Sequence, residues 1–309
     1  MRKGGTVRAW LELLRLRYQA DNLLAYFAAS ALAVSTLGGP LEWGWFLLGV
    51  VDLILAQVAL ELLDGYHDHR QGAHTRKDGA PTWTGGSGVL AEGRVRPVHA
   101  LFAAWLMGAL AVLVFAVLVA GRTGAGGLAI GAIGCMVGAG WAMPPFKLSY
   151  RGLGEILIGV VAGPLMTAHA WVVATGKLEP RAFLIGVPFG LLQLAMALAH
   201  GIVDRDADAR VGKRTLVVRI GRPMAASAHS VTVVLAFASI AVLVALGIAP
   251  LSALAVVILV PLARQSARLV RDAASSAAAR ATLARSYPPY KLLILTGSIL
   301  TLACLWRTG

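Results

Sequence analysis

Long uncharged apolar runs, separated by short polar and basic segments, make up most of this chain. A run of about 20 apolar residues is long enough to cross a bilayer as a helix, and Gly, Pro and basic clusters bound the runs here. The pattern predicts nine spans, at residues 19–38, 43–66, 98–121, 125–143, 153–175, 182–203, 224–247, 251–263 and 290–306. The uncharged stretch 223–263 counts as two spans because Gly247 and Pro250 interrupt it. We therefore expect an all-α polytopic membrane bundle of about nine transmembrane helices around a central cavity.

Composition supports this fold class. Apolar residues make up 58% of the 309 positions and charged residues only 14%, and the mean hydropathy of +0.73 is far above that of an ordinary soluble domain. A large soluble α/β barrel is excluded because its outer helices would need charged faces that these few residues cannot supply. The two cysteines, Cys135 and Cys304, both lie in apolar runs, which indicates neither a disulfide framework nor a thiolate metal site.

The net charge of +13 comes from basic residues that are unevenly distributed among the connections between the predicted spans. All but four of the 28 lysines and arginines fall in the N-terminal arm or in the even-numbered connections; the exceptions are Arg122, Lys177, Arg181 and Arg307. The positive-inside rule then places the N-terminus in the cytoplasm and the C-terminus outside. This distribution predicts a protein of the cytoplasmic membrane. Its expected partner is the lipid bilayer, and the positive charge is not expected to bind a nucleic acid. The basic start resembles a signal peptide, but we interpret it as leading into an uncleaved first span.

Two stripes of polar residues close the second and the sixth span. Glu61, Asp64 and Asp68 fall within about 60° of one another on a helix. His200, Asp204 and Asp208 follow at i, i+4 and i+8. Four crossings separate the stripes, so both should reach the cytoplasmic boundary and face each other across the bundle. The 140-residue spacing between Asp64 and Asp204 suggests a duplication within one domain, 1–309, with halves of about 1–150 and 151–309.

Carboxylates at the membrane boundary imply water, cations or a site, because an ionised carboxylate near the bilayer core costs about 2.5–3.5 kcal/mol. An oxygen-only cluster suits Mg²⁺, which completes its shell with water and substrate phosphate. Basic residues near both stripes could bind phosphate oxygens; they include Lys77, Lys147, Arg151 and Lys213. Acidic and basic groups together indicate a metal-bound phosphate. Glu155 is expected either to pair with Arg151, four residues earlier, or to act in catalysis.

Three segments resemble the UbiA family of intramembrane prenyltransferases. Asp204–Gly221 is similar to its second aspartate-rich motif, including the trailing Gly-Lys-x-Thr-Leu. Pro144–Glu155, with the following Gly163–Pro164, and Gly85–Gly93 resemble the branch that prenylates 1,4-dihydroxy-2-naphthoate in menaquinone synthesis. The resemblance covers most of residues 57 to 221.

The resemblance implies a Mg²⁺-dependent transfer of an isoprenyl chain from an isoprenyl diphosphate to an aromatic acceptor. It implies that the catalytic metal ligands are Asp64, Asp68, Asp204 and Asp208, with Glu61 as a further candidate. The basic candidates for holding the diphosphate are Lys147, Arg151, Lys213 and Lys77, and Tyr66 could offer its ring face to an allylic cation. The active site is then expected toward the cytoplasmic face.

The chain departs from the family in the first motif and at two positions on the sixth span. Where the usual pattern reads N-D-x-x-D, with a further Asp downstream, this chain has Asp64-Gly65-Tyr66-His67-Asp68, then Gly72 and His74. One Asp has become Gly, and Asp64 stands at the Asn position. His200 and Gly201 stand where the naphthoate branch often carries Asn. These changes keep two further hypotheses open. One is a membrane terpene cyclase that ionises the same donor without an acceptor. The other is a transporter or lipid-binding protein, against which the intact second motif argues.

Overall fold

Helices are the only regular elements in residues 3–15, 19–72, 87–143 and 145–306, which are the residues that the computed structural model describes. The first half contains α1 (Lys3–Leu14), α2 (Ala20–Leu37), α3 (Trp43–Arg70), α4 (Pro97–Leu118) and α5 (Gly124–Ala142). The second half contains α6 (Gly154–Val160), α7 (Met166–Thr175), α8 (Pro180–Leu184), α9 (Val187–Arg210), α10 (Leu216–Ala245), α11 (Val260–Ser275), α12 (Ala277–Ser286) and α13 (Pro288–Trp306). Short π- and 3₁₀-helical turns join several of them, at Val119–Thr123, Leu148–Tyr150, Val161–Leu165 and Leu251–Leu259.

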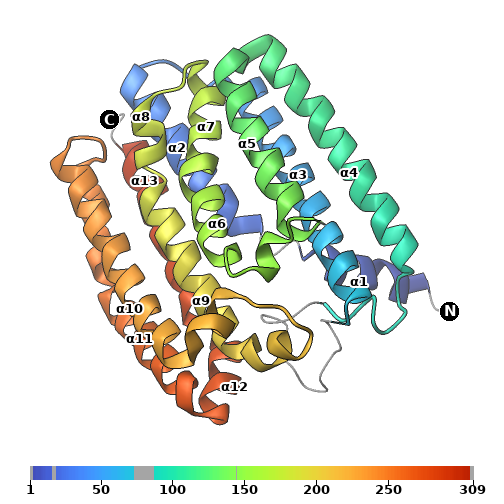
Figure 1. The fold of residues 1–309 in the computed structure, drawn as a ribbon. Coiled ribbons are helices and arrows are strands. Elements are labelled where there is room, and N and C mark those ends of the chain that lie inside the picture. Colours follow the sequence, from blue (N-terminus) through green and yellow to red (C-terminus); the bar gives the residue numbers. More distant parts are fainter. Residues whose placement is uncertain (1–2, 16–18, 73–86, 144, 307–309) are drawn as a thin grey trace.

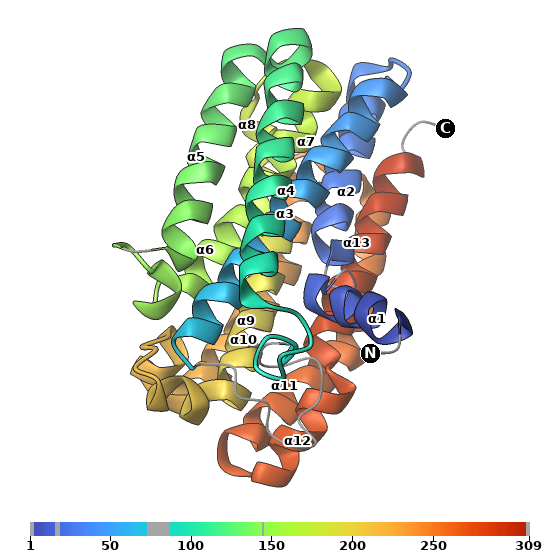
Figure 2. The same ribbon diagram turned by 90° about the vertical axis from the view of Figure 1, so that its right-hand side faces the viewer.

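Eight stretches of the described chain are long and apolar enough to cross a membrane. One of them, Pro97–Trp141, has 45 residues, which as a straight helix would be about 67 Å long, twice the hydrocarbon thickness. It folds back at Gly124, whose φ is +53°, so that α4 and α5 run side by side (Figures 1 and 2). The described residues therefore form nine crossings, each overlapping one predicted span. The predicted all-α membrane bundle is confirmed.

The helices differ in how deeply they lie in the bundle. In the most apolar window of Pro180–Arg210, 67% of the residues are buried, against 17% for Pro97–Trp141. The helix α9 is therefore central, and α4 and α5 present apolar side chains such as Phe102 and Leu113 outward, where lipid would cover them. The largest core cluster joins α2, α7, α9 and α13 around the buried Trp171 and Tyr26.

A contact between glycines sets the position of α9. The span formed by α6 and α7 approaches α9 so closely that a Cβ on Gly159 would stand 2.8 Å from the carbonyl oxygen of Gly190. A Cβ on Gly163 would stand 2.5 Å from the carbonyl oxygen of Gly186. Small residues of this kind allow membrane helices to touch through their backbones. We refer to Gly159, Gly163, Gly186 and Gly190 as the glycine seam.

Candidate active site

The ends of α3 and α9 carry the two acidic stripes to the same end of the bundle, the lower end in Figure 1. The sequence pattern ended these spans at residues 66 and 203, whereas α3 continues to Arg70 and α9 to Arg210. Helix formation continues past the first charged residues because the backbone hydrogen bonds need no apolar side chains. All four predicted aspartates therefore lie on rigid helix, and Asp68 is 1% exposed. Asp64, Asp204 and Asp208 are partly exposed.

Both oxygens of the Asp68 carboxylate are engaged. The Tyr150 hydroxyl donates to Oδ1 at 2.5 Å, and the Lys213 ammonium lies 3.2 Å from Oδ2. These residues come from three places in the chain: the end of α3, the turn before α6, and the loop between α9 and α10. The predicted acidic motif on α3 and the predicted lysine after α9 are thus in direct contact.

Backbone contacts hold the two loops that supply these groups. The Lys213 N–H donates to the carbonyl of Asp208 at 2.9 Å, and the Arg214 N–H donates to the carbonyl of Tyr150 at 3.1 Å. The side chain of Thr215 then caps α10 by accepting from the Val218 N–H. Lys213 is therefore fixed between a helix end and a helix start.

The electrostatics keep Lys213 charged and Tyr150 neutral. Burial lowers the pKa of the Lys213 ammonium, but the charges of Asp68, Asp64 and Asp208 outweigh burial and raise the pKa above its ordinary value. Burial raises the pKa of Tyr150, and the charge and hydrogen bond of Asp68 raise it further. The charges of three of the four predicted aspartates, Asp64, Asp68 and Asp208, thus stabilise the charged form of Lys213.

Two of the other predicted phosphate-binding residues, Lys147 and Arg151, lie close to Tyr150 or on its loop. The Lys147 ammonium is 5.4 Å from the centre of the Tyr150 ring, and that of Lys213 is 5.0 Å from it. Arg151 is exposed, and its guanidinium donates to the carbonyl of Pro145 at 2.8 Å. Lys77 lies outside the described residues.

Glu61 and Tyr66 complete the predicted set. The Glu61 carboxylate lies 3.5 Å from the Arg15 guanidinium, so it contacts the segment that leads into α2. The Tyr66 ring has the Arg70 guanidinium 6.0 Å from its centre and the His67 ring edge-on at 5.4 Å. Both residues are partly buried on the same helix as Asp64 and Asp68.

The donor set at this end fits Mg²⁺ in its chemistry. No group of three or more His, Cys, Asp or Glu side chains within the described ranges stands close enough to hold a metal by itself. Mg²⁺ is commonly bound by only one or two carboxylates, with water and substrate phosphates as its other ligands. Asp64, Asp68 and Asp208, which all act on Lys213, are oxygen donors of the right kind for such a site.

Sequence reasoning missed Tyr150, and one of its two expectations for Glu155, the ion pair with Arg151, is wrong. Tyr150 lies between Lys147 and Arg151 in a segment that the resemblance covers, which is the signal that could have singled it out. Glu155 does not pair with Arg151. It is 7% exposed, and its Oε1 accepts from the Val217 N–H at 3.4 Å, so it holds the start of α10 instead.

Gly201 also has a structural explanation. A Cβ at this position would stand 2.6 Å from the Val217 side chain, because α9 and α10 pack closely there. An Asn side chain therefore does not fit at position 201 in this packing, whereas His200 lies one turn before Asp204 on the same face.

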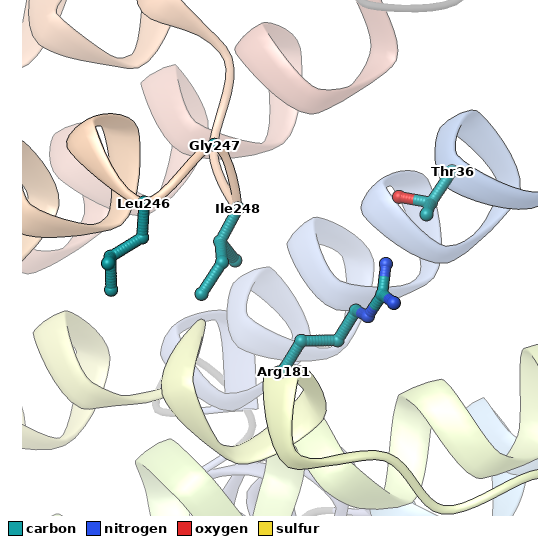
Figure 3. Close-up of a pocket in the computed structure, with 5 residues that line it drawn as sticks. All are labelled: Thr36, Arg181, Leu246, Gly247 and Ile248. Atoms are coloured by element: carbon teal, nitrogen blue, oxygen red, sulfur yellow. The ribbon is translucent and has the colours of Figure 1, made fainter.

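A separate cavity of about 310 Å³ opens at the opposite end of the bundle. Figure 3 shows the Arg181 side chain directed toward Thr36, with Leu246 and Ile248 opposite. Thr36 lies in the last turn of α2 and Arg181 in the first turn of α8, so this cavity is at the opposite end of the bundle from the aspartates.

The fold and this site define a class of protein: an integral membrane helical bundle with aspartates and lysines gathered at one end of its spans. Residues 22–287 match the sequence profile of the UbiA prenyltransferase family, and the chain belongs to that family.

Two bacterial relatives and two solved structures illustrate the similarity. The chain is 24% identical to a 1,4-dihydroxy-2-naphthoate octaprenyltransferase of Bacillus subtilis over 57% of this chain and 55% of that protein. It is 27% identical to a protein of the same name from Escherichia coli over 72% of each. The chain thus spans about half the length of the Bacillus protein.

Among solved structures, a digeranylgeranylglyceryl phosphate synthase is similar with a TM-score of 0.64 at 13% identity, over 97% of this chain and 99% of that one. A UbiA homologue from Archaeoglobus fulgidus bound to GPP and Mg²⁺ is similar with a TM-score of 0.61 at 12% identity, over 96% and 99%. These likenesses confirm the fold.

Proposed function

We propose that this chain is a Mg²⁺-dependent prenyltransferase that moves an isoprenyl chain from an isoprenyl diphosphate to an aromatic acceptor of the naphthoate or quinone-precursor kind. The contact of Tyr150 and Lys213 with Asp68 carries the proposal, since it joins acidic and basic motifs at one end of an apolar bundle. The names of the bacterial relatives support the acceptor class. The GPP and Mg²⁺ bound to the Archaeoglobus homologue support the donor and the metal.

In this proposal Asp64, Asp68, Asp204 and Asp208 hold Mg²⁺, and Glu61 is a further candidate. The bound cation would neutralise the diphosphate leaving group and orient it. Tyr150 and Lys213 hold Asp68 in one orientation, so the carboxylate presents a fixed position to its ligands.

The basic residues bind the diphosphate oxygens. Lys213 and Lys147 both lie over the Tyr150 ring and remain the first candidates, with Arg151 and Lys77 as outer contacts. As the C–O bond of the donor breaks, pyrophosphate leaves and an allylic cation forms in the bundle. The surrounding spans keep water away, and the Tyr66 ring stabilises the positive charge. A ring carbon of the acceptor then forms the new C–C bond, and the ring loses a carboxylate as CO₂ or a proton.

We place the N-terminus and this site on the cytoplasmic face of the cytoplasmic membrane. The positive-inside distribution supports this orientation. Arg15, 3.5 Å from Glu61, and Lys213 of the α9–α10 loop lie at the same end as the aspartates, whereas Arg122 and Arg181 lie at the other.

A direct assay tests the proposal. Purified protein is incubated with Mg²⁺, a series of isoprenyl diphosphates, and 1,4-dihydroxy-2-naphthoate or no acceptor, and products are identified by mass spectrometry. Prenylated aromatic product that forms only with acceptor, and is lost in Asp204→Ala, supports transfer. Absence of any product and unchanged properties of Asp204→Ala would instead favour a transporter or lipid-binding protein.

The altered first motif favours terpene cyclisation as a second candidate. Gly65 removes one carboxylate from that motif, and Gly72 follows at the end of α3 with φ +72°. A cyclase would use the same donor and would release a hydrocarbon or terpene alcohol with pyrophosphate in the tube without acceptor.

A further inference from the structure

A second polar cluster lies deeper in the membrane on the same face of α9 as the aspartates. Gln193 precedes Asp204 by eleven residues, which places the two within about 20° on the helix and about 16 Å apart along it. The Gln193 Nε2 donates to Oδ2 of Asp21 on α2 at 2.6 Å. Gln193 is 2% exposed and Asp21 is 4% exposed. An amide and a carboxyl group thus meet inside the bundle.

This pair has hydrogen-bonding capacity that the described residues do not use. The Gln193 Oε1 has no hydrogen-bond partner among them, and no hydrogen bond reaches Oδ1 of Asp21, although the first N–H groups of α2 lie near its carboxyl group. Since Nε2 faces Asp21, the Gln193 oxygen points the other way. Leaving such an atom buried and unmatched costs about 1–3 kcal/mol, and polar groups within spans commonly mark substrate sites.

The pair is connected to the aspartate end of the bundle. Glu61, one turn before Asp64 on α3, lies near enough for its charge to act on Asp21. On α9, His200 lies between Gln193 and Asp204 on the same face, and its ring packs 4.8 Å from the Tyr287 ring of the α12–α13 turn. Aromatic side chains therefore line α9 between the aspartates and the Asp21–Gln193 pair.

We propose that Asp21 and Gln193 bind a ring hydroxyl of the aromatic acceptor. The proposal rests on the proposed prenyl transfer and names the group that this chain recognises on its acceptor. The Gln193 oxygen can only accept a hydrogen bond, so its ligand must carry a donor. A hydroxyl donates to that oxygen, whereas an ether or a carboxylate does not. The charges of Asp21 and Glu61 further disfavour a carboxylate here, so an acceptor carboxylate would be directed away from the pair.

Equilibrium binding separates this proposal from the proposed reaction. Full-length protein in detergent is titrated anaerobically with 1,4-dihydroxynaphthalene and with 1,4-dimethoxynaphthalene, which has the same ring but no donor. The dihydroxy probe should bind at least about tenfold more tightly to the wild type, the value of one buried hydrogen bond. Gln193→Met should abolish that preference and leave the affinity for GPP unchanged.

Asp21→Asn should change the affinities for the two probes in opposite directions, which a merely structural role of Asp21 would not do. The amide oxygen introduced by this substitution can still accept from Gln193, and the new NH₂ group is then turned toward the ligand. Affinity for the dihydroxy probe should fall while affinity for the dimethoxy probe rises. Asp52→Asn is the matched control, because Asp52 is a buried carboxylate near His169. It lies nine residues, or about two and a half turns of α3, before Glu61, the α3 residue whose charge acts on Asp21. This substitution should leave both affinities unchanged.

Two results would overturn the inference: equal affinity of the wild type for both probes, or unchanged probe preference in correctly folded Gln193→Met and Asp21→Asn proteins. A hydroxyl-dependent preference that persists while no prenylated product forms would instead refute the proposed transfer and leave this binding site standing.

Discussion

Lys213 and Asp68 are separated by 145 residues in the sequence and lie 3.2 Å apart in the structure. Their contact ties the loop after α9 to the end of α3. The exposed fraction of the Lys213 side chain is 14% and that of Asp68 is 1%, so the contact is shielded from water. Ion pairs in such surroundings differ from those on a protein surface, because neither charge can regain its hydration when the other is removed.

Lys213→Met should therefore lower the free energy of unfolding by about 3 kcal/mol, since it leaves Asp68 buried without its cation. It should also reduce the affinity for isoprenyl diphosphate. Lys213→Arg should restore most of the stability. Thermal unfolding in detergent measures the first effect and donor titration the second. Arg210→Met, at the exposed end of α9, is the control, and equal behaviour of the two Met variants would contradict the interpretation.

Tyr150→Phe removes a hydrogen bond to a carboxylate and should cost about 1.5–3 kcal/mol of stability. Because Asp68 loses one of the two groups that orient it, the Mg²⁺ concentration for half-maximal activity should rise several-fold. Tyr26→Phe removes a hydroxyl that donates to the Phe46 carbonyl at the other end of the bundle. It should lower stability by about 1 kcal/mol without changing the Mg²⁺ requirement. A Mg²⁺ titration of both variants distinguishes the two effects.

Gly65 in the first motif and Gly72, four residues after the motif ends, should respond differently to substitution by Asp. A Cβ at Gly65 meets nothing within 4 Å, and Asp is tolerated in a helix about as well as Gly. Gly65→Asp should fold normally and lower the Mg²⁺ concentration needed for activity, because it adds a carboxylate next to Asp64. Gly72 has φ +72°, so Gly72→Asp should lose about 1 kcal/mol of stability from backbone strain. A higher Mg²⁺ requirement in Gly65→Asp would refute a metal role for this stripe.

Ala substitutions in the glycine seam should weaken the packing between the α6–α7 span and α9. The new methyl group of Gly163→Ala meets the backbone of Gly186 and Gly190, which cannot move aside as a side chain would. We expect a loss of about 1–3 kcal/mol and a lower unfolding temperature. Gly44→Ala, where a Cβ meets nothing within 4 Å at the start of α3, should not lower it. Indistinguishable unfolding temperatures would show that the seam is not a close contact.

The sequence predicted the number, order and approximate ends of the spans, because apolar length is the main requirement for a crossing. The apolar pattern alone ends at residues 66 and 203, because a charged residue stops an apolar pattern but does not stop a helix; the helical spacing of the acidic stripes carried the prediction on to Asp68 and Asp208, two residues short of the ends of α3 and α9. Helical spacing and the family resemblance also predicted that Asp68 and Lys213 belong to one site, and the structure brings them into contact.

The missed contacts depend on tertiary packing that residue spacing does not encode. Tyr150 reaches Asp68 only through the folded loop before α6. The contact of Glu155 with the Val217 N–H likewise joins residues 62 positions apart. A contact between distant segments was therefore predicted only where a charge pattern or a motif marked both of its partners.

The glycine seam has a mechanical consequence. Where two helices touch through backbone atoms, no side chain can change rotamer to let one slide along the other. The span of α6 and α7 and the N-terminal half of α9 should therefore move as one rigid body during turnover. Any opening that admits a long substrate from the lipid must then occur elsewhere around α9, with the seam acting as the fixed support.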